Sequence, residues 1–187
     1  FLNAAGESFI PTGGTTKDIV SIDFSARDKS LDGIEFVTMC DIDNPMYGPT
    51  GASYIFGPQK GADPAMVEFL DQGIQNLCAV IEKDKGVDLS RVPGAGAAGA
   101  MGAGMIAFFD SRLQMGIQTV LDTVGFDEVI SVADMIFTGE GKLDSQSLRG
   151  KVVIGVASRA KKQNIPVTVI VGGADDAEIQ EAYDIDV

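Results

Sequence analysis

The segment ADMIFTGEGKLDSQSLRGKVVIGVASRAKKQNIPVTVIVGG, residues 133–173, alternates between apolar runs and a long polar stretch. Its β-rich apolar runs at 133–139 and 165–173 predict two strands, and residues 151–163 between them predict a helix. A strand, a helix and a second strand in this order are typical of a parallel sheet with a helical crossover. The segment therefore places the chain in the α/β class, with mainly parallel sheets.

The loop after the first of these strands is strongly polar. Residues 138–151 include two glycines within four residues, three hydroxyls, two carboxylates and an amide. In open α/β sheets, ligands bind beyond the carboxyl ends of the strands. Ser145 or Ser147 could instead cap the helix that follows, and Glu140 could be a solvated side chain. Because few apolar residues pin this loop, we favour a ligand site.

Composition and charge exclude several classes of function. The 187-residue chain is 45% hydrophobic, which is enough for a sizeable core. Its formal net charge of −13 repels nucleic acid and anionic membranes. It contains no histidine, which rules out His-based triads and His/Cys zinc sites. Acid–base chemistry therefore depends on Asp, Glu or Lys.

The cysteines and the hydropathy indicate a compartment. Cys40 ends an apolar run and Cys78 lies in a helical pattern, so both are expected to be small buried side chains in a reducing cytosol. No apolar stretch reaches the ~18 residues of a membrane span, and no signal peptide is visible, so we expect a cytoplasmic protein. The chain opens on FLNAAGESF, residues 1–9, without an initiator Met, and is expected to be a fragment of a longer polypeptide.

Residues before the opening segment continue the alternation. Residues 34–41 predict a buried strand, and apolar positions at helical spacing predict a helix over 63–85 with Asp63 as its N-cap. The glycine–alanine stretch at 93–104 passes into a helix that is expected to end near residue 116. A boundary near that residue divides the chain into two α/β lobes.

A second polar segment follows the strand predicted at 34–41. Asp41 and Asp43 alternate with apolar residues and so point to one side, with Asn44 next in line. Such oxygen ligands suit Mg2+, which takes one or two carboxylates and fills its shell with water and phosphate. An Asx-rich turn that begins at Asn44 explains the same residues equally well. Hydroxyl donors and the cation Lys60 further along favour a metal and phosphate site, although a lone lysine is more often only solvated.

The glycine–alanine stretch contains Gly94, Gly96 and Gly99 in a G-x-G-x-x-G spacing. It is not a dinucleotide fingerprint, because no buried strand leads into it, and it is not a P-loop, because no Gly-Lys-Ser/Thr follows. Either the helix N-terminus aims its amides at an anion, or the small residues let helices pack closely. We assign the anion to these three glycines and close packing to Gly102 and Gly104.

Taken in order, the sequences CDIDNP..GP.GAS..FGPQKGA, PGAGAAGA.GAG and FTGEGKLDSQSLRGK...GVA..AK....PV..I.GG resemble the bacterial glycerate kinase family of the glyoxylate/glucarate type. Three unrelated motifs recur in the family's order, and the resemblance covers essentially all of residues 1–187, as the middle and C-terminal part of the family's chain. The resemblance implies two α/β domains with an active-site cleft between them, in which residues 117–187 belong to a flavodoxin-like domain and residues 1–116 to the other. It also implies ATP-dependent phosphorylation of D-glycerate to 2-phosphoglycerate, with 3-phosphoglycerate as the alternative product, assisted by Mg2+.

Residue roles follow from phosphoryl transfer, which depends on positioning and charge neutralisation. We expect Asp41 and Asp43 to bind Mg2+ or to accept the proton of the glycerate hydroxyl, with Asn44 as a further metal ligand. Lys60 is expected to meet phosphate or carboxylate charge as a catalytic residue. The predicted nucleotide-binding residues are Gly94, Gly96, Gly99, Thr138, Gly139, Glu140, Gly141, Asp144, Ser145, Gln146, Ser147 and Lys151.

Two alternatives stay open. One is a kinase for another small hydroxy acid, and the other is a non-catalytic α/β domain that binds a phosphorylated metabolite. The expected partners are D-glycerate, ATP and the rest of the protein's own chain, without nucleic acid or membrane; a homo-oligomer is compatible with the sequence. We favour the glycerate kinase, in which the three polar segments are expected to converge on one triphosphate and its divalent ion.

Overall fold

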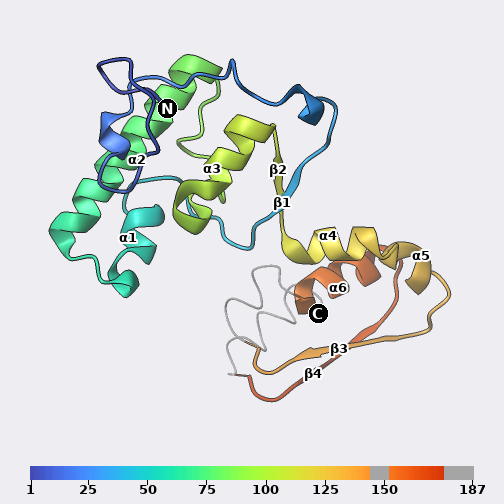
Figure 1. The fold of residues 1–187 in the computed structure, drawn as a ribbon. Helices are drawn as coiled ribbons and strands as arrows, with labels where there is room; N and C mark the ends of the chain where they lie inside the picture. Colours follow the sequence, from blue (N-terminus) through green and yellow to red (C-terminus); the bar gives the residue numbers. More distant parts are fainter. Residues whose placement is uncertain (144–151, 175–187) are drawn as a thin grey trace. The chain divides into compact units, whose positions relative to one another are not determined.

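The structure, a computed structural model, describes residues 1–143 and 152–174. The chain divides into two compact units, Phe1–Leu113 (unit 1) and Gln114–Val187 (unit 2). Both combine helices with short strands (Figure 1), and the pairing determined in unit 2 is parallel, which confirms the predicted α/β class. The domain boundary at residue 116 and the flavodoxin-like character of the second domain stay predictions.

Unit 1 is mainly helical, and its two short strands pair with each other. Its elements are the 3-10 turns η1 (Thr16–Asp18), η2 (Lys29–Leu31) and η3 (Pro58–Lys60), the helices α1 (Ala52–Phe56), α2 (Pro64–Lys85) and α3 (Ala97–Phe109), and the strands β1 (Val37–Met39) and β2 (Arg112–Gln114).

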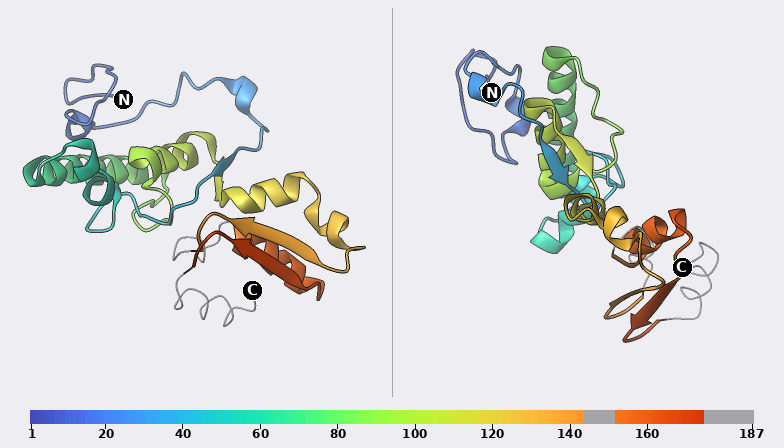
Figure 2. Two further views of the ribbon diagram at one scale, coloured as in Figure 1. Left: turned by 90° about the horizontal axis from the view of Figure 1, so that it is seen from below. Right: turned by 90° about the vertical axis from the view of Figure 1, so that its right-hand side faces the viewer.

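Helix α2 confirms the helix predicted over 63–85. Its N-cap Asp63 accepts a hydrogen bond from the amide of Met66 at 2.8 Å, which satisfies one of the unpaired donors of the first turn. The N-terminal segment lies against this helix (Figures 1 and 2). There the side-chain amide of Asn76 donates to the carbonyl oxygens of Thr16 and Ile19 at 3.2 and 2.9 Å. Helix α2 therefore fixes the position of residues that precede it by some sixty positions.

The core of unit 1 forms where α2 and α3 meet the loops that precede them. Its completely or almost completely buried members are Met46, Cys78, Ile81, Leu89, Ala95, Ala100, Ala103 and Ala107. The alanines keep α3 narrow, so that its backbone approaches these loops closely. Cys78 is buried as predicted, whereas Cys40 is only half-buried, and both are free thiols.

Two sequence predictions about unit 1 are wrong. The buried strand expected at 34–41 is reduced to β1, in which Met39 is 63% exposed, because a two-stranded sheet leaves much of its surface uncovered. The helix expected to end near residue 116 ends at Phe109. There Asp110 adopts a left-handed conformation with φ 51°, and the chain turns into β2.

Unit 2 contains the strand–helix–strand arrangement that the sequence predicts. Strands β3 (Ile136–Glu140) and β4 (Val167–Val171) pair in parallel, and α6 (Val152–Lys162), which connects them in sequence, packs against them (Figure 2). Two shorter helices, α4 (Gly116–Thr123) and α5 (Phe126–Ile130), pack against α6. Nowhere in residues 1–143 and 152–174 is a helix both long and apolar enough for a membrane span.

Arg159 of α6 connects this helix to α4 and α5. Its guanidinium donates to the side-chain oxygen of Gln118 at 2.9 and 3.0 Å and to the carboxylate of Asp127 at 2.8 Å, and it also pairs with Asp122. These hydrogen bonds, to Asp122 first and then Asp127, raise the pKa of Arg159 above its ordinary value. The side chain is only 14% exposed, so it acts as an internal connection between the helices.

Candidate functional site

The loop at residues 41–51 is fixed to the glycine-rich stretch that lies fifty residues further along the chain. The backbone amide of Gly96 donates to the carbonyl oxygen of Asn44 at 3.0 Å. A Cβ atom at Gly96 would lie 2.1 Å from the carbonyl oxygen of Pro45, so a side chain cannot be accommodated there. Two of the three polar segments singled out by the sequence are therefore in direct contact.

The same loop is held from the other side by Asp71 of α2. One carboxylate oxygen of Asp71 accepts a hydrogen bond from the amide of Gly48 at 2.9 Å, and the other accepts one from the Gln75 side chain at 2.8 Å. Asp71 is 3% exposed, and none of the lysines or arginines in the described part of the chain forms a salt bridge with it. A buried carboxylate loses its hydration, so it depends on the two hydrogen bonds that it accepts. The bond from the Gly48 amide therefore holds the loop at one defined position on α2.

The predicted metal ligands lie at the start of this loop. Asp41 and Asp43 are both exposed, and the side-chain amide of Asn44 donates to the carbonyl oxygen of Thr50 at 2.8 Å. No group of three or more Asp, Glu, Cys or His side chains in the described residues is placed to hold a metal ion. Two neighbouring exposed carboxylates nevertheless fit Mg2+, which takes few protein ligands and completes its shell with water and phosphate.

The glycine-rich stretch is not the plain helix N-terminus that the sequence predicts. Ala98, Gly99 and Ala100 have left-handed backbone angles, with φ 51°, 69° and 69°, before α3 continues as a regular helix. Such angles are unfavourable for alanine and cost of the order of 1 kcal/mol or more each. Gly102 packs on this turn, since its Cβ would lie 2.3 Å from the carbonyl oxygen of Gly94.

The close packing predicted for Gly102 and Gly104 is only partly correct. Gly102 permits a close approach, but to the preceding turn of its own segment instead of to another helix. A Cβ at Gly104 would meet nothing nearer than the ring of Phe108 at 3.8 Å, which is ordinary contact. Gly104 is thus not required by packing among the described residues.

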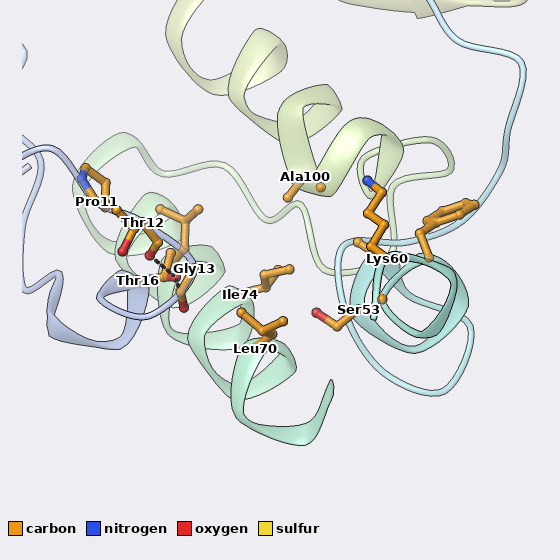
Figure 3. Close-up of a pocket in the computed structure, with 14 residues that line it drawn as sticks. Pro11, Thr12, Gly13, Thr16, Ser53, Lys60, Leu70, Ile74 and Ala100 are labelled. Carbon is orange, nitrogen blue, oxygen red and sulfur yellow. Dashed lines mark hydrogen bonds between the residues drawn. The ribbon is translucent and has the colours of Figure 1, made fainter. Parts of the chain in front are cut away.

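A pocket of about 350 Å3 opens beside this turn; we call it the unit 1 pocket (Figure 3). Its walls come from the N-terminal segment, α1, η3, α2 and the start of α3. The lining residues are Pro11, Thr12, Gly13, Thr16, Ala52, Ser53, Phe56, Gly57, Lys60, Leu70, Ile74, Leu77, Gly99 and Ala100. Of the residues predicted from the sequence, Lys60 and Gly99 lie in this pocket.

Two polar groups of the unit 1 pocket lack partners in the structure as described. Ser53 is 6% exposed, and its hydroxyl makes no hydrogen bond to any described residue, although it points into the pocket (Figure 3). Lys60 is exposed, extends toward Ala100 and forms no ion pair with a described residue. In a chain with a net charge of −13, a lysine without a carboxylate partner is a natural contact for an anion.

The third polar segment begins in unit 2. Thr138 and Glu140 lie on the same face of β3, paired with Val169 and Val171 of β4, and Val153 of α6 packs against that face. One carboxylate oxygen of Glu140 is buried and has no hydrogen-bond partner within the described ranges. Glu140 is therefore not the freely solvated side chain that the sequence allowed as an alternative.

Glycine allows β3 and β4 to approach each other at their carboxyl ends. A Cβ at Gly139 would lie 2.2 Å from the carbonyl oxygen of Ile170, and one at Gly172 would lie 2.6 Å from that of Gly141. Gly141 itself has open space around it. The predicted residues Asp144, Ser145, Gln146, Ser147 and Lys151 lie outside the described residues.

Comparison with known proteins assigns the chain to a family. The profile of the glycerate kinase family matches residues 1–187. This chain belongs to the glycerate kinase family. The resemblance seen in the three sequence motifs is therefore confirmed.

Several members of the glycerate kinase family are close relatives. The chain is 48% identical over 172 residues to a glycerate kinase of Bacillus cereus, covering 92% of this chain and 45% of the relative. It is 44% identical over 175 residues to the glycerate 2-kinase of Escherichia coli, covering 93% of this chain and 46% of the relative. A crystal structure from Salmonella typhimurium LT2, assigned as a glycerate kinase 2, has a TM-score of 0.79 at 42% identity over 91% of this chain and 45% of that one. The chain thus spans less than half the length of these relatives.

Sequence analysis missed two parts of this candidate site. Asp71 carried a usable signal, because it lies four residues after Val67 and three before Ile74, on the face that the helical spacing assigns to the core. A carboxylate at such a position indicates a buried anchor. The apolar wall of the unit 1 pocket carried no separate signal, because Leu70 and Ile74 are equally typical of a core.

Proposed function

We propose that this chain takes part in the ATP-dependent phosphorylation of D-glycerate to 2-phosphoglycerate. The observation that carries the proposal is the contact of Gly96 with Asn44, which brings a carboxylate-bearing loop and a glycine-rich turn together. Phosphoryl transfer needs positioned charges near a phosphate and little further covalent chemistry from the protein. The name of the Escherichia coli relative, a glycerate 2-kinase, supports the 2-hydroxyl as the acceptor.

Asp41 and Asp43 are the proposed acidic groups of the site. With Asn44 nearby, they would hold Mg2+, and one of them would accept the proton of the attacking hydroxyl. When bound there, Mg2+ would neutralise the negative charge of the phosphates. Lys60, which has no carboxylate partner among the described residues, would meet the negative charge of a phosphate or of the glycerate carboxylate.

The glycine-rich turn and the third polar segment complete the proposal. Gly94, Gly96 and Gly99 would lie against the phosphates. Thr138, Gly139, Glu140 and Gly141 of unit 2 keep the nucleotide-binding role proposed from the sequence. Asp144, Ser145, Gln146, Ser147 and Lys151 keep the nucleotide-binding role proposed from the sequence. The buried, unpartnered oxygen of Glu140 supports a ligand or metal contact at that end of β3.

A coupled assay of ADP formation tests the proposal, with D-glycerate, glycolate and tartronate as acceptors. We expect turnover with D-glycerate, and a loss of at least about a hundredfold in Asp41→Asn with a nearly unchanged thermal midpoint. Asp134→Asn, the same change at an exposed residue before β3, is the control and should keep full activity. If Asp41→Asn keeps its activity but loses stability, Asp41 is structural. If glycolate or tartronate is preferred, the acceptor is another small hydroxy acid.

The second candidate is a domain that binds a phosphorylated metabolite without turning it over. It requires only the unit 1 pocket and the cation of Lys60 at its rim, without the acidic groups Asp41 and Asp43. Calorimetry with MgATP, with and without D-glycerate, separates the two candidates. Heat of binding without formation of ADP supports the binding domain, and glycerate-dependent formation of ADP excludes it.

The free thiols of Cys40 and Cys78 support the reducing cytoplasm proposed as the location.

A further inference from the structure

We propose that the unit 1 pocket binds the adenine base of the nucleotide, with the phosphates leaving the pocket past Lys60. The inference rests on the proposed function, because it assigns a subsite to the ATP of that reaction. One wall of the pocket is formed by the N-terminal turn at residues 11–16 and by α2, both of which lie outside the three sequence motifs.

The walls of the pocket match the faces of an aromatic base. Leu70 and Ile74 of α2 line it with their hydrocarbon side chains (Figure 3). Phe56 of α1 also belongs to the lining. A volume of about 350 Å3 lies at the lower end of the usual range for pockets that bind small molecules, so the pocket has room for the base. A three-carbon hydroxy acid carries a polar group on every carbon, and hydrocarbon walls would leave those groups without hydrogen bonds. The lining therefore favours the base over glycerate.

The polar groups of the pocket match the edge of the base and the phosphate chain. The hydroxyl of Thr16 already donates to backbone carbonyls in the turn at residues 12–16. The hydroxyl of Ser53 is still available to a ligand. Ser53 is 6% exposed, and its hydroxyl points into the pocket and has no hydrogen-bond partner in the described residues. The ring nitrogens and amino group of adenine supply such a partner. Lys60, at the exposed rim, supplies the charge that a phosphate requires.

Two neighbouring glycines provide a matched pair of variants. A Cβ at Gly13 would lie 2.8 Å from a methyl of Leu70, so Gly13→Ala narrows the pocket between the turn and α2. A Cβ at Gly14 would meet only the hydroxyl of Thr12, at 3.8 Å, and Gly14 does not line the pocket. Both glycines have negative φ, so neither substitution strains the backbone. The two variants therefore differ chiefly in the space left for a ligand.

The test is calorimetry of adenosine, without Mg2+ and without phosphates, against the 187-residue chain. We expect adenosine to bind, Gly13→Ala to weaken binding at least tenfold, and Gly14→Ala to leave it unchanged. Ser53→Ala removes one hydrogen bond and should weaken adenosine binding about three- to tenfold. Lys60→Met should weaken ATP binding while leaving adenosine binding unchanged, because the base does not reach the rim.

The inference is overturned if adenosine does not bind, if Gly13→Ala and Gly14→Ala bind it equally, or if Gly13→Ala weakens D-glycerate binding and spares adenosine. Failure of the proposed function looks different. In that case adenosine binds and responds to Gly13→Ala, but no phosphoglycerate forms from MgATP and D-glycerate. If the wild-type chain phosphorylates D-glycerate and Gly13→Ala binds ATP with unchanged affinity, the proposed function stands and only the adenine subsite is wrong.

Discussion

Removal of the Asp71 carboxylate should release the loop that carries the proposed acidic groups. Asp71→Ala leaves the amide of Gly48 without its acceptor in a site where Asp71 itself is 3% exposed. A buried donor left unsatisfied costs about 1–3 kcal/mol, and hydrogen bonds to a charged acceptor lie toward the upper end of that range. We therefore expect a loss of about 2–3 kcal/mol in the free energy that holds the loop to α2.

Asp71→Asn is the matched control for this loss. The asparagine keeps an oxygen for the amide of Gly48, and the side-chain amide of Gln75 can turn its oxygen toward the new NH2 group. Both hydrogen bonds survive, so the loss should stay below about 1 kcal/mol. Removing the buried charge also removes the cost of its desolvation.

Amide hydrogen exchange measures this energy at the residue concerned. In Asp71→Ala the amide of Gly48 should exchange about thirty- to 150-fold faster, the factor that corresponds to 2–3 kcal/mol. Amides of β3 in unit 2 should keep their rates and serve as an internal reference. Equal protection of Gly48 in Asp71→Ala and in the wild-type chain would refute the anchoring role. Equal losses of protection in the alanine and asparagine variants would also refute it. They would mean that the charge of Asp71, and not the geometry of its hydrogen bonds, holds the loop.

Three further predictions concern packing and charge. Gly96→Ala, at the residue that precedes α3, should destabilise unit 1 by about 1–3 kcal/mol through overpacking, whereas Gly104→Ala within α3 should stabilise it by about 0.5–1 kcal/mol. Urea denaturation measures both changes, and equal effects would contradict the close approach at Gly96. Arg159→Met should lower the free energy of unfolding by about 1–2 kcal/mol in the same assay. Arg159→Lys should restore only part of this stability, because lysine lacks the planar guanidinium with its several donors. Full restoration by lysine would show that the positive charge alone suffices. The backbone amide of Ser30 donates to the carboxylate of Asp28 and lowers the pKa of Asp28 below its ordinary value. This contribution to stability is complete above the unfolded pKa and is lost as the pH falls through the lower folded pKa. A carboxyl NMR titration of Asp28 with an ordinary midpoint would contradict it.

Local features of the fold could be predicted from the sequence. Helix α2 has a capping residue, Asp63, and an unbroken apolar spacing, and both determine structure through neighbours in sequence. The parallel pair in unit 2 was predictable because the strands and the helix between them each have a clear composition. The exposed state of β1 was not, since apolar residues in a strand do not reveal whether anything covers them.

Contacts between distant segments could not be predicted in the same way. The hydrogen bond from Gly96 to Asn44 joins residues fifty positions apart, and no spacing within either segment implies it. The left-handed turn at Ala98–Ala100 opposes the intrinsic preference of alanine, so the surrounding packing decides it. The predicted convergence of the segment at Thr138–Gly141 with the other two stays a prediction.

The central claim is that the loop at 41–51 and the glycine-rich turn form one nucleotide site within unit 1. Backbone amide shifts on titration with MgATP, observed by heteronuclear NMR on the 187-residue chain, test it most directly. The account predicts a single saturating transition that moves the amides of Asp43, Ser53, Lys60 and Gly99 with one dissociation constant. Saturable binding of MgATP that leaves these four amides unmoved would contradict it.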